Sequence, residues 1–161
     1  MAHRSTTPGR VTSQLPLSTV LGLGLASGLL GASVMTLSQT TEQSLITNRP
    51  NSYVPARTLE RVLGIRAASD SQLWGLNMAM HYGQGAVAGM IRAYMSWRGV
   101  RGPFADLMFV GVRLFIDQSL ENWTGVGALP WTWPVEEQIL DIVHKTLFAV
   151  ATGYVLDKWI A

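Results

Sequence analysis

The chain has 161 residues, of which 48% are hydrophobic and 14% are charged, and its formal net charge is +2. A chain of this length forms one domain with a buried core. The charged fraction is well below the roughly 25% of soluble domains, which indicates that part of the surface faces lipid. The small net charge, with no basic patch, argues against a nucleic-acid partner. The lack of cysteine excludes disulfides, thiolate metal sites and thiol nucleophiles.

Residues 1–14 form a polar segment with Arg4, Arg10 and no acid, which we interpret as a short tail rather than a targeting segment. Residues 15–37 follow with no charge in 23 positions. As a helix they would extend about 34 Å, enough to cross a bilayer once. A cleaved signal peptide is the main alternative, but the apolar run is longer than an ordinary signal core. Gly24 and Gly28 have the spacing at which two membrane helices approach closely.

A polar segment, residues 38–71, separates this span from the next one. Within it, residues 56–63 predict a short helix that ends at Gly64. Leu59, Val62 and Leu63 lie on its apolar side, while Arg57, Glu60 and Arg61 lie on its polar side. This pattern is typical of a helix that lies along the membrane surface.

The second expected span covers residues 73–97, with Ser69 or Asp70 as its N-cap. His81, Gly85, Gly89 and Arg92 share one face of this helix. Because the two glycines allow close packing, we expect this polar stripe to contact a neighbouring helix rather than lipid.

The third expected span, residues 104–123, is an apolar helix that carries four charges. Asp106, Arg113 and Asp117 fall within about 20° of one line, and Glu121 lies about 40° from Asp117. The pattern fits a soluble amphipathic helix, and it also fits a membrane helix whose charges face other helices.

The fourth expected span covers residues 135–159. Glu137, Asp141 and His144 line one side, with Lys145 at the edge, and Gly153 belongs to a further small-residue contact. All six tryptophans fall at the ends of apolar segments, as in the aromatic belts of membrane proteins: Trp74, Trp97, Trp123, Trp131, Trp133 and Trp159.

Together these elements predict an all-α fold, a four-helix transmembrane bundle in one membrane domain that covers residues 15–161. Several segments carry a family resemblance: GLASGLLGASVMT, RPNSYVPARTLERVLG, NMAMHYGQGAVAGM, the charged third helix and PWTWPVEEQILDIVHKTLFAVATG. In these the chain resembles the YagU-like group of uncharacterised small multi-pass membrane proteins. The resemblance implies membrane residence and a helical bundle, and it assigns no catalytic or binding residue.

Site motifs are sparse. Asp141 and His144 have the i, i+3 spacing of di-iron bundles, with Glu121 or Asp117 to complete a shell, but no second helix repeats the motif. A haem between His81 and His144 is permitted by their positions. Neither pattern is specific enough to assign a site, so we expect no metal and no cofactor. We expect a hydrogen bond between Asp141 and His144 instead. No catalytic motif ties a nucleophile to a base, so an enzyme is unsupported.

The main constellation is a set of ionisable residues at membrane depth, where isolated charges are costly. We expect it to hold the bundle together or to dock a partner, either a second copy of the chain or another membrane protein, in a non-enzymatic protein of the lipid bilayer. The alternative is a small proton-coupled or ion-handling carrier that uses His81, Asp117, Asp141 and His144. A soluble helical domain is the second alternative. The full set is His81, Arg92, Asp106, Arg113, Asp117, Glu121, Asp141, His144 and Lys145.

Overall fold

The computed structural model describes residues 15–160, which contain five α-helices and no β-strand. The all-α prediction is therefore confirmed for this range, and the expected N-terminal tail lies outside it. The helices are α1 (Leu17–Glu42), α2 (Val54–Leu63), α3 (Asp70–Trp97), α4 (Gly102–Trp123) and α5 (Val135–Trp159), with a π-helical turn η1 (Gln43–Thr47) and a 3-10 turn η2 (Pro130–Thr132).

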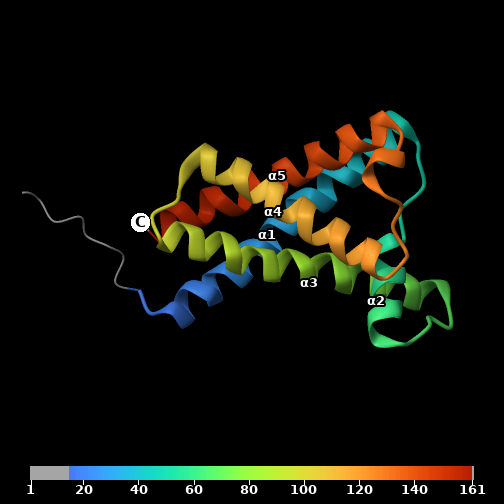
Figure 1. Ribbon diagram of the computed structural model, residues 1–161, viewed down its shortest axis with the longest axis horizontal. Coiled ribbons are helices and arrows are strands. Elements are labelled where there is room, and N and C mark those ends of the chain that lie inside the picture. Colours follow the sequence, from blue (N-terminus) through green and yellow to red (C-terminus); the bar gives the residue numbers. More distant parts are fainter. Residues whose placement is uncertain (1–14, 161) are drawn as a thin grey trace, which may run out of the picture.

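The four long helices form an elongated bundle in which α1 is central, because it packs most extensively on α3 and then on α5 (Figure 1). Helix α4 packs mainly on α5 and has little contact with α3. One end of the bundle carries α2 and the loop around η2, and we call it the α2 end. The opposite end carries the α3–α4 turn and the C-terminus (Figure 1).

Helix α1 is longer than the sequence predicted. It continues past residue 37 to Glu42 and then into the π-helical turn, which Asn48 ends with a left-handed φ of 54°. On this extension the hydroxyl groups of Thr41 and Ser44 are paired within the helix, since each bonds to a carbonyl one turn earlier, at 2.8 Å for Thr41 and Leu37.

Glycines set the distance between α1 and α3. A Cβ on Gly89 would lie 2.7 Å from the Cα of Gly28, and one on Gly24 would lie 2.8 Å from the carbonyl oxygen of Gly89. Gly85 faces the same seam, where a Cβ would lie 2.9 Å from the Cβ of Ala32. No side chain larger than hydrogen fits at these positions without moving a backbone. The two helices therefore touch through their main chains.

Helix α2 is fixed to α3 by a buried asparagine. The side-chain oxygen of Asn77 accepts a hydrogen bond from the amide of Ala56 at 3.0 Å, and its amide group donates to the carbonyl of Ser52 at 3.2 Å. Helix α2 ends at Gly64 with a left-handed φ of 67°, as predicted. Ser69 caps α3 by accepting a hydrogen bond from the amide of Gln72 at 3.3 Å.

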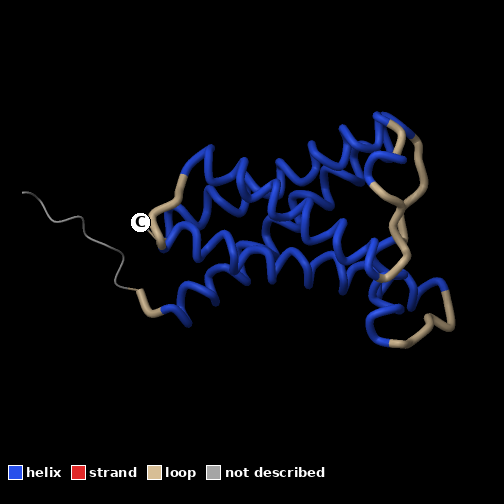
Figure 2. The backbone as a smooth tube through the Cα atoms, viewed as in Figure 1, coloured by secondary structure: helices blue, strands red, loops and turns tan. Residues whose placement is uncertain are grey.

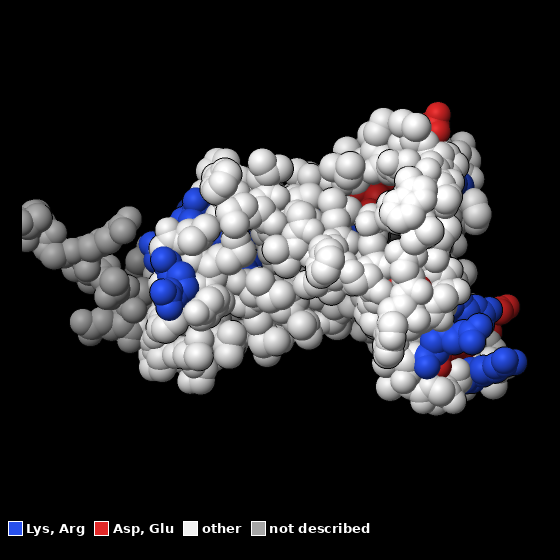
Figure 3. Space-filling view, in the orientation of Figure 1, with Lys and Arg blue, Asp and Glu red and all other residues white. Residues whose placement is uncertain are grey.

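Two helices in residues 15–160 are long and apolar enough to cross a membrane, namely Leu17–Thr47 and Val135–Trp159. Helices α3 and α4 have the length, but their sequences are more polar. All four long helices nevertheless expose large apolar side chains, which include Leu29, Val87, Leu107, Phe115 and Val150. On the face drawn in Figure 3, charged side chains gather at the two ends, and few reach the surface between them.

The close seam predicts a size limit at Gly89. Changing Gly89→Ala should lower the free energy of unfolding by about 1–3 kcal/mol, since the new methyl group meets the α1 backbone. The matched control is Gly83→Ala on the same helix, where a Cβ has no neighbour within 4 Å. This control should be neutral or slightly stabilising. Thermal melting of the purified protein in detergent measures both, and equal effects would contradict the seam.

Glu60 on α2 predicts a local response to pH. Its carboxylate accepts hydrogen bonds from the amide of Ala67 at 2.7 Å and from Arg57 at 2.8 Å, and these hold its pKa below the ordinary 4.5. A lowered folded-state pKa stabilises the loop above pH 4.5, and this contribution is lost as the pH falls through the lowered value. Amide exchange at residues 64–68, corrected for the intrinsic rate, should therefore increase on acidification in the wild type. In Glu60→Gln it should stay pH-independent.

Candidate functional site

The ionisable residues singled out in the sequence fall into separate groups along the bundle. The group nearest the C-terminus is centred on Arg92 of α3, whose side chain is fully buried. Its guanidinium contacts Asp106 of α4 at 2.8 Å and Asp157 of α5 at 2.9 Å. Ser96 also donates to Asp157 at 2.6 Å. Arg92 therefore joins three helices through one network.

This network is completed by the backbone. The amide of Gly102 donates to Asp157 at 2.8 Å at the start of α4, so the same carboxylate fixes the α3–α4 turn. Gly153 of α5 provides the space, since a Cβ there would lie 2.7 Å from Nη2 of Arg92 and would collide with Asp106. The charges are matched and densely hydrogen-bonded, which is the condition under which a buried ion pair is tolerated.

A cavity of about 670 Å³ occupies the half of the bundle next to the α2 end. There α1 and α5 diverge from α3 and α4 (Figure 2), and the cavity lies between them. It reaches Arg113, ten residues from the end of α4 and hence about 15 Å along that helix. Beyond this point an apolar core of Phe109, Val110, Phe148 and Ala149 closes the bundle.

The lining of the cavity brings together residues from all four long helices. Seven of the nine predicted ionic residues, all except Arg92 and Asp106, line the cavity from α3, α4 and α5. The lining residues with ionisable side chains are Arg49, His81, Arg113, Asp117, Glu121, Glu137, Asp141, His144 and Lys145.

At the inner end of the cavity, four charges from α4 and α5 alternate in sign. Lys145 donates to both oxygens of Asp141 at 2.7 Å and lies 3.5 Å from Asp117. Nε of Arg113 lies 3.2 Å from Oδ2 of Asp117, so the predicted pair forms. The guanidinium also lies 5.3 Å above the ring of Phe148.

This inner set is not fully hydrogen-bonded. Arg113 is 2% exposed and Asp117 is 5% exposed, yet Nε and Nη1 of the arginine and Oδ1 of the aspartate have no hydrogen-bond partner among residues 15–160. Buried polar atoms are normally paired, and leaving one unpaired is costly. The site therefore has unused donor and acceptor capacity, in contrast to the Arg92 network.

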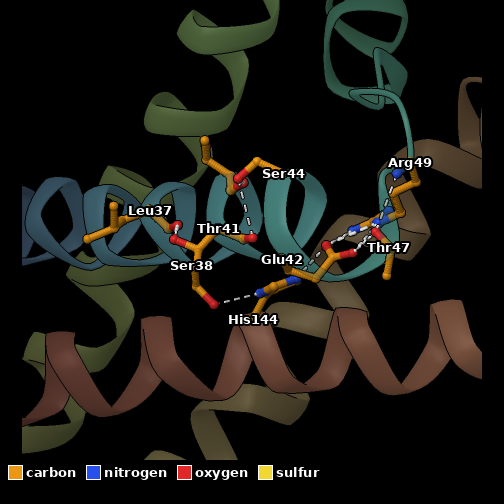
Figure 4. Close-up of polar contacts among 9 residues, drawn as sticks. Leu37, Ser38, Thr41, Glu42, Ser44, Thr47, Arg49 and His144 are labelled. Atoms are coloured by element: carbon orange, nitrogen blue, oxygen red, sulfur yellow. Dashed lines mark hydrogen bonds and ion pairs between the residues drawn. The ribbon is translucent and has the colours of Figure 1, made fainter.

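A third group lies beside the cavity, where α1 meets α5 (Figure 4). Glu42 accepts two-pronged hydrogen bonds from Arg49, with the shortest at 2.7 Å, and it also contacts Thr47. On its other side Nε2 of His144 lies 3.4 Å from Glu42, and Nδ1 lies 2.9 Å from Ser38. Both ring nitrogens of His144 therefore have partners on α1.

One predicted contact has a different outcome. The Asp141–His144 hydrogen bond is wrong, because Asp141 pairs with Lys145 and His144 turns to α1. His81 is tied to α1 as well, through Thr36 at 3.0 Å. Within the described residues, no three His, Asp or Glu side chains are close enough to hold a metal ion.

Sequence reasoning missed several partners. Asp157 was not singled out, although it is an acid in the last turn of α5 and so could have been matched to the basic α3–α4 turn. Glu42 and Arg49 were missed because α1 was expected to end at residue 37. The sequence does indicate this extension, because polar residues recur there at helical spacing. They are Thr36, Gln39, Thr40 and Gln43, and all four line the cavity.

Comparison with known proteins gives no match with any family model, curated protein or solved structure. The resemblance to the YagU-like group therefore stays an expectation.

The Arg92 network predicts a large effect of removing its centre. Arg92→Leu leaves Asp106 and Asp157 facing each other without a cation, which should lower the free energy of unfolding by about 3–5 kcal/mol. The control is Arg98→Leu in the exposed α3–α4 turn, which should change it by less than about 0.5 kcal/mol. Denaturation curves in detergent measure the free energy of unfolding of the two variants. Equal curves would show that the network contributes no stability.

Proposed function

We propose that this chain is an integral membrane protein with four spans, α1, α3, α4 and α5, and that its cavity takes up a small polar or ionic solute from the α2 side. One observation carries the proposal: a hydrophilic cavity reaches the middle of a bundle whose outer surface is apolar. A soluble protein has no need for that arrangement, whereas a protein that handles solutes within a bilayer requires it.

The outer surface supports the membrane part of the proposal. Exposed apolar patches of this extent are unusual on soluble monomers. Tryptophans lie near helix ends and in the η2 loop, and Trp123 and Trp131 are more than three-quarters exposed. Helix α2 presents exposed Val62 and Leu63 beside its arginines, which suits the headgroup region. The glycine seam between α1 and α3 is the kind of contact that membrane helices use.

The cavity supports the functional part. His81, Asp117, Asp141 and His144, the four residues expected for a carrier, all line it. Its volume of about 670 Å³ lies within the range of small-molecule sites. Because the apolar core closes the far half, the cavity is open on one side only, as expected for one state of a carrier.

The alternative, a structural or partner-docking bundle held by buried ion pairs, is favoured by one observation only. The Arg92 network is saturated with protein partners and does not belong to the lining of this cavity, which favours a structural role for it. The two roles are compatible, since one half of the bundle fixes the helices and the other half holds the solute. The following experiment distinguishes the proposed membrane protein from a soluble helical domain.

Because the chain has no cysteine, single cysteines report water access without background. Gln84 of α3 lines the cavity, and Val87 lies less than one turn away on the outer surface, where it is 54% exposed. In membrane vesicles, Gln84→Cys should react with a charged, membrane-impermeant methanethiosulfonate reagent. Val87→Cys should not, because lipid covers it.

The pair of variants separates the hypotheses. If both cysteines react, the bundle is soluble. If neither reacts, the cavity is not open to water and the proposed function fails. Labelling after solubilisation in urea and detergent is the control that both thiols are present.

A further inference from the structure

The charges around the cavity are unequal once their pairs are assigned. Each basic residue of the lining already has a carboxylate, because Arg49 pairs with Glu42, Arg113 with Asp117, and Lys145 with Asp141. Two further carboxylates line the cavity, those of Glu121 and Glu137, and neither has an ion pair within 4.0 Å among residues 15–160. In the lining, carboxyl groups therefore outnumber basic side chains, and two of them have no basic partner among residues 15–160.

Aromatic side chains share the lining with these carboxylates. Tyr53 comes from the segment before α2, Trp74 from the first turns of α3, and Trp133 from the residues after η2. All three segments lie at the α2 end, so the aromatic residues surround the entrance. Carboxylates combined with indole and phenol faces are the groups that bind organic cations, through charge pairing and cation–π attraction.

At the inner end of the cavity, unpaired polar atoms determine which hydrogen-bonding groups a solute must present. Oδ1 of Asp117 is buried and has no donor among residues 15–160, so an ammonium N–H suits it. Nη1 of Arg113 has no acceptor in the same range, so a hydroxyl or carbonyl oxygen on the solute suits that position. A divalent metal ion is a poorer fit, since no group of three suitable ligands occurs among the described residues.

We propose that the cavity selects small organic cations, namely primary amines with an apolar or aromatic body and at least one hydrogen-bonding oxygen. Glu121 supplies the unpaired carboxyl group that pairs with the ammonium group, Asp117 accepts the N–H bond, and the aromatic residues at the entrance hold the body of the solute. This inference rests on the proposed function and assigns its class of substrate.

The test compares two molecules of the same shape and opposite charge. Tyramine and 3-(4-hydroxyphenyl)propionate share a phenol and a two-carbon arm, and they end in an ammonium group and a carboxylate respectively. Isothermal titration calorimetry with the full chain in lipid nanodiscs should show saturable binding of tyramine. Binding of the propionate should be at least about tenfold weaker.

Variants assign the effect to the cavity. Glu121→Gln should weaken tyramine binding about tenfold, whereas Glu136→Gln, which removes a carboxylate of α5 outside the lining, should leave it unchanged. Trp74→Leu should weaken it about threefold and serves as the second variant if Glu121→Gln does not fold.

Each outcome is decisive. If the propionate binds as well as tyramine, or if Glu121→Gln binds tyramine normally, selection of cations is wrong while the solute cavity stands. If neither molecule binds but Gln84→Cys is labelled, the substrate class is overturned and the proposed function is not. If Gln84→Cys is not labelled, both the substrate class and the proposed function are overturned.

Discussion

Two buried guanidinium groups determine how these helices can pack. A charge taken out of water is tolerated only where it is paired and hydrogen-bonded, so each arginine restricts the elements around it. Arg92 meets two carboxylates and a serine, which fixes α3, α4 and α5 at one level. Arg113 has one carboxylate and an aromatic ring beside it, and two of its nitrogens make no hydrogen bond to residues 15–160. One half of the bundle is therefore closed, and the other half is open.

The backbone geometry explains why the open half exists. Helices α1 and α3 touch through Gly24, Gly28, Gly85 and Gly89 and cross there, so they separate as they continue toward the α2 end (Figure 2). Helix α4 crosses α5 and has little contact with α3 (Figure 1), which leaves the same end unfilled. Tight contact at one level and divergence at another are two consequences of the same crossing. The cavity lies where polar residues of α1, α3, α4 and α5 face one another.

Much of this architecture could be predicted from the sequence. The ends of α2 to α5 follow approximately from apolar length, from the N-cap at Ser69 or Asp70 and from the glycine at residue 64, because these signals are local. The inward direction of Arg92, Arg113 and Asp117 also follows, since helical periodicity determines which residues share a face. The choice of partners does not follow, because it depends on the distance and crossing of helices that are far apart in sequence. For this reason Asp157 and Glu42 were missed, and Asp141 pairs with Lys145 rather than with His144.

The distribution of charge has a consequence for assembly in the proposed membrane. Helices α1 and α5 are apolar enough to insert independently, whereas α4 carries Asp106, Arg113, Asp117 and Glu121. A central charge costs roughly 2.5–3.5 kcal/mol on insertion scales, so α4 alone is a poor membrane helix. Its partners remove most of that cost, because Asp106 is neutralised from α3, and Asp117 from Arg113 on its own helix and from Lys145 on α5. Glu121 alone is left without an ion pair among the described residues. The carboxyl group of α4 that assembly leaves without a basic partner therefore lines the cavity, where water or a cationic solute can reach it.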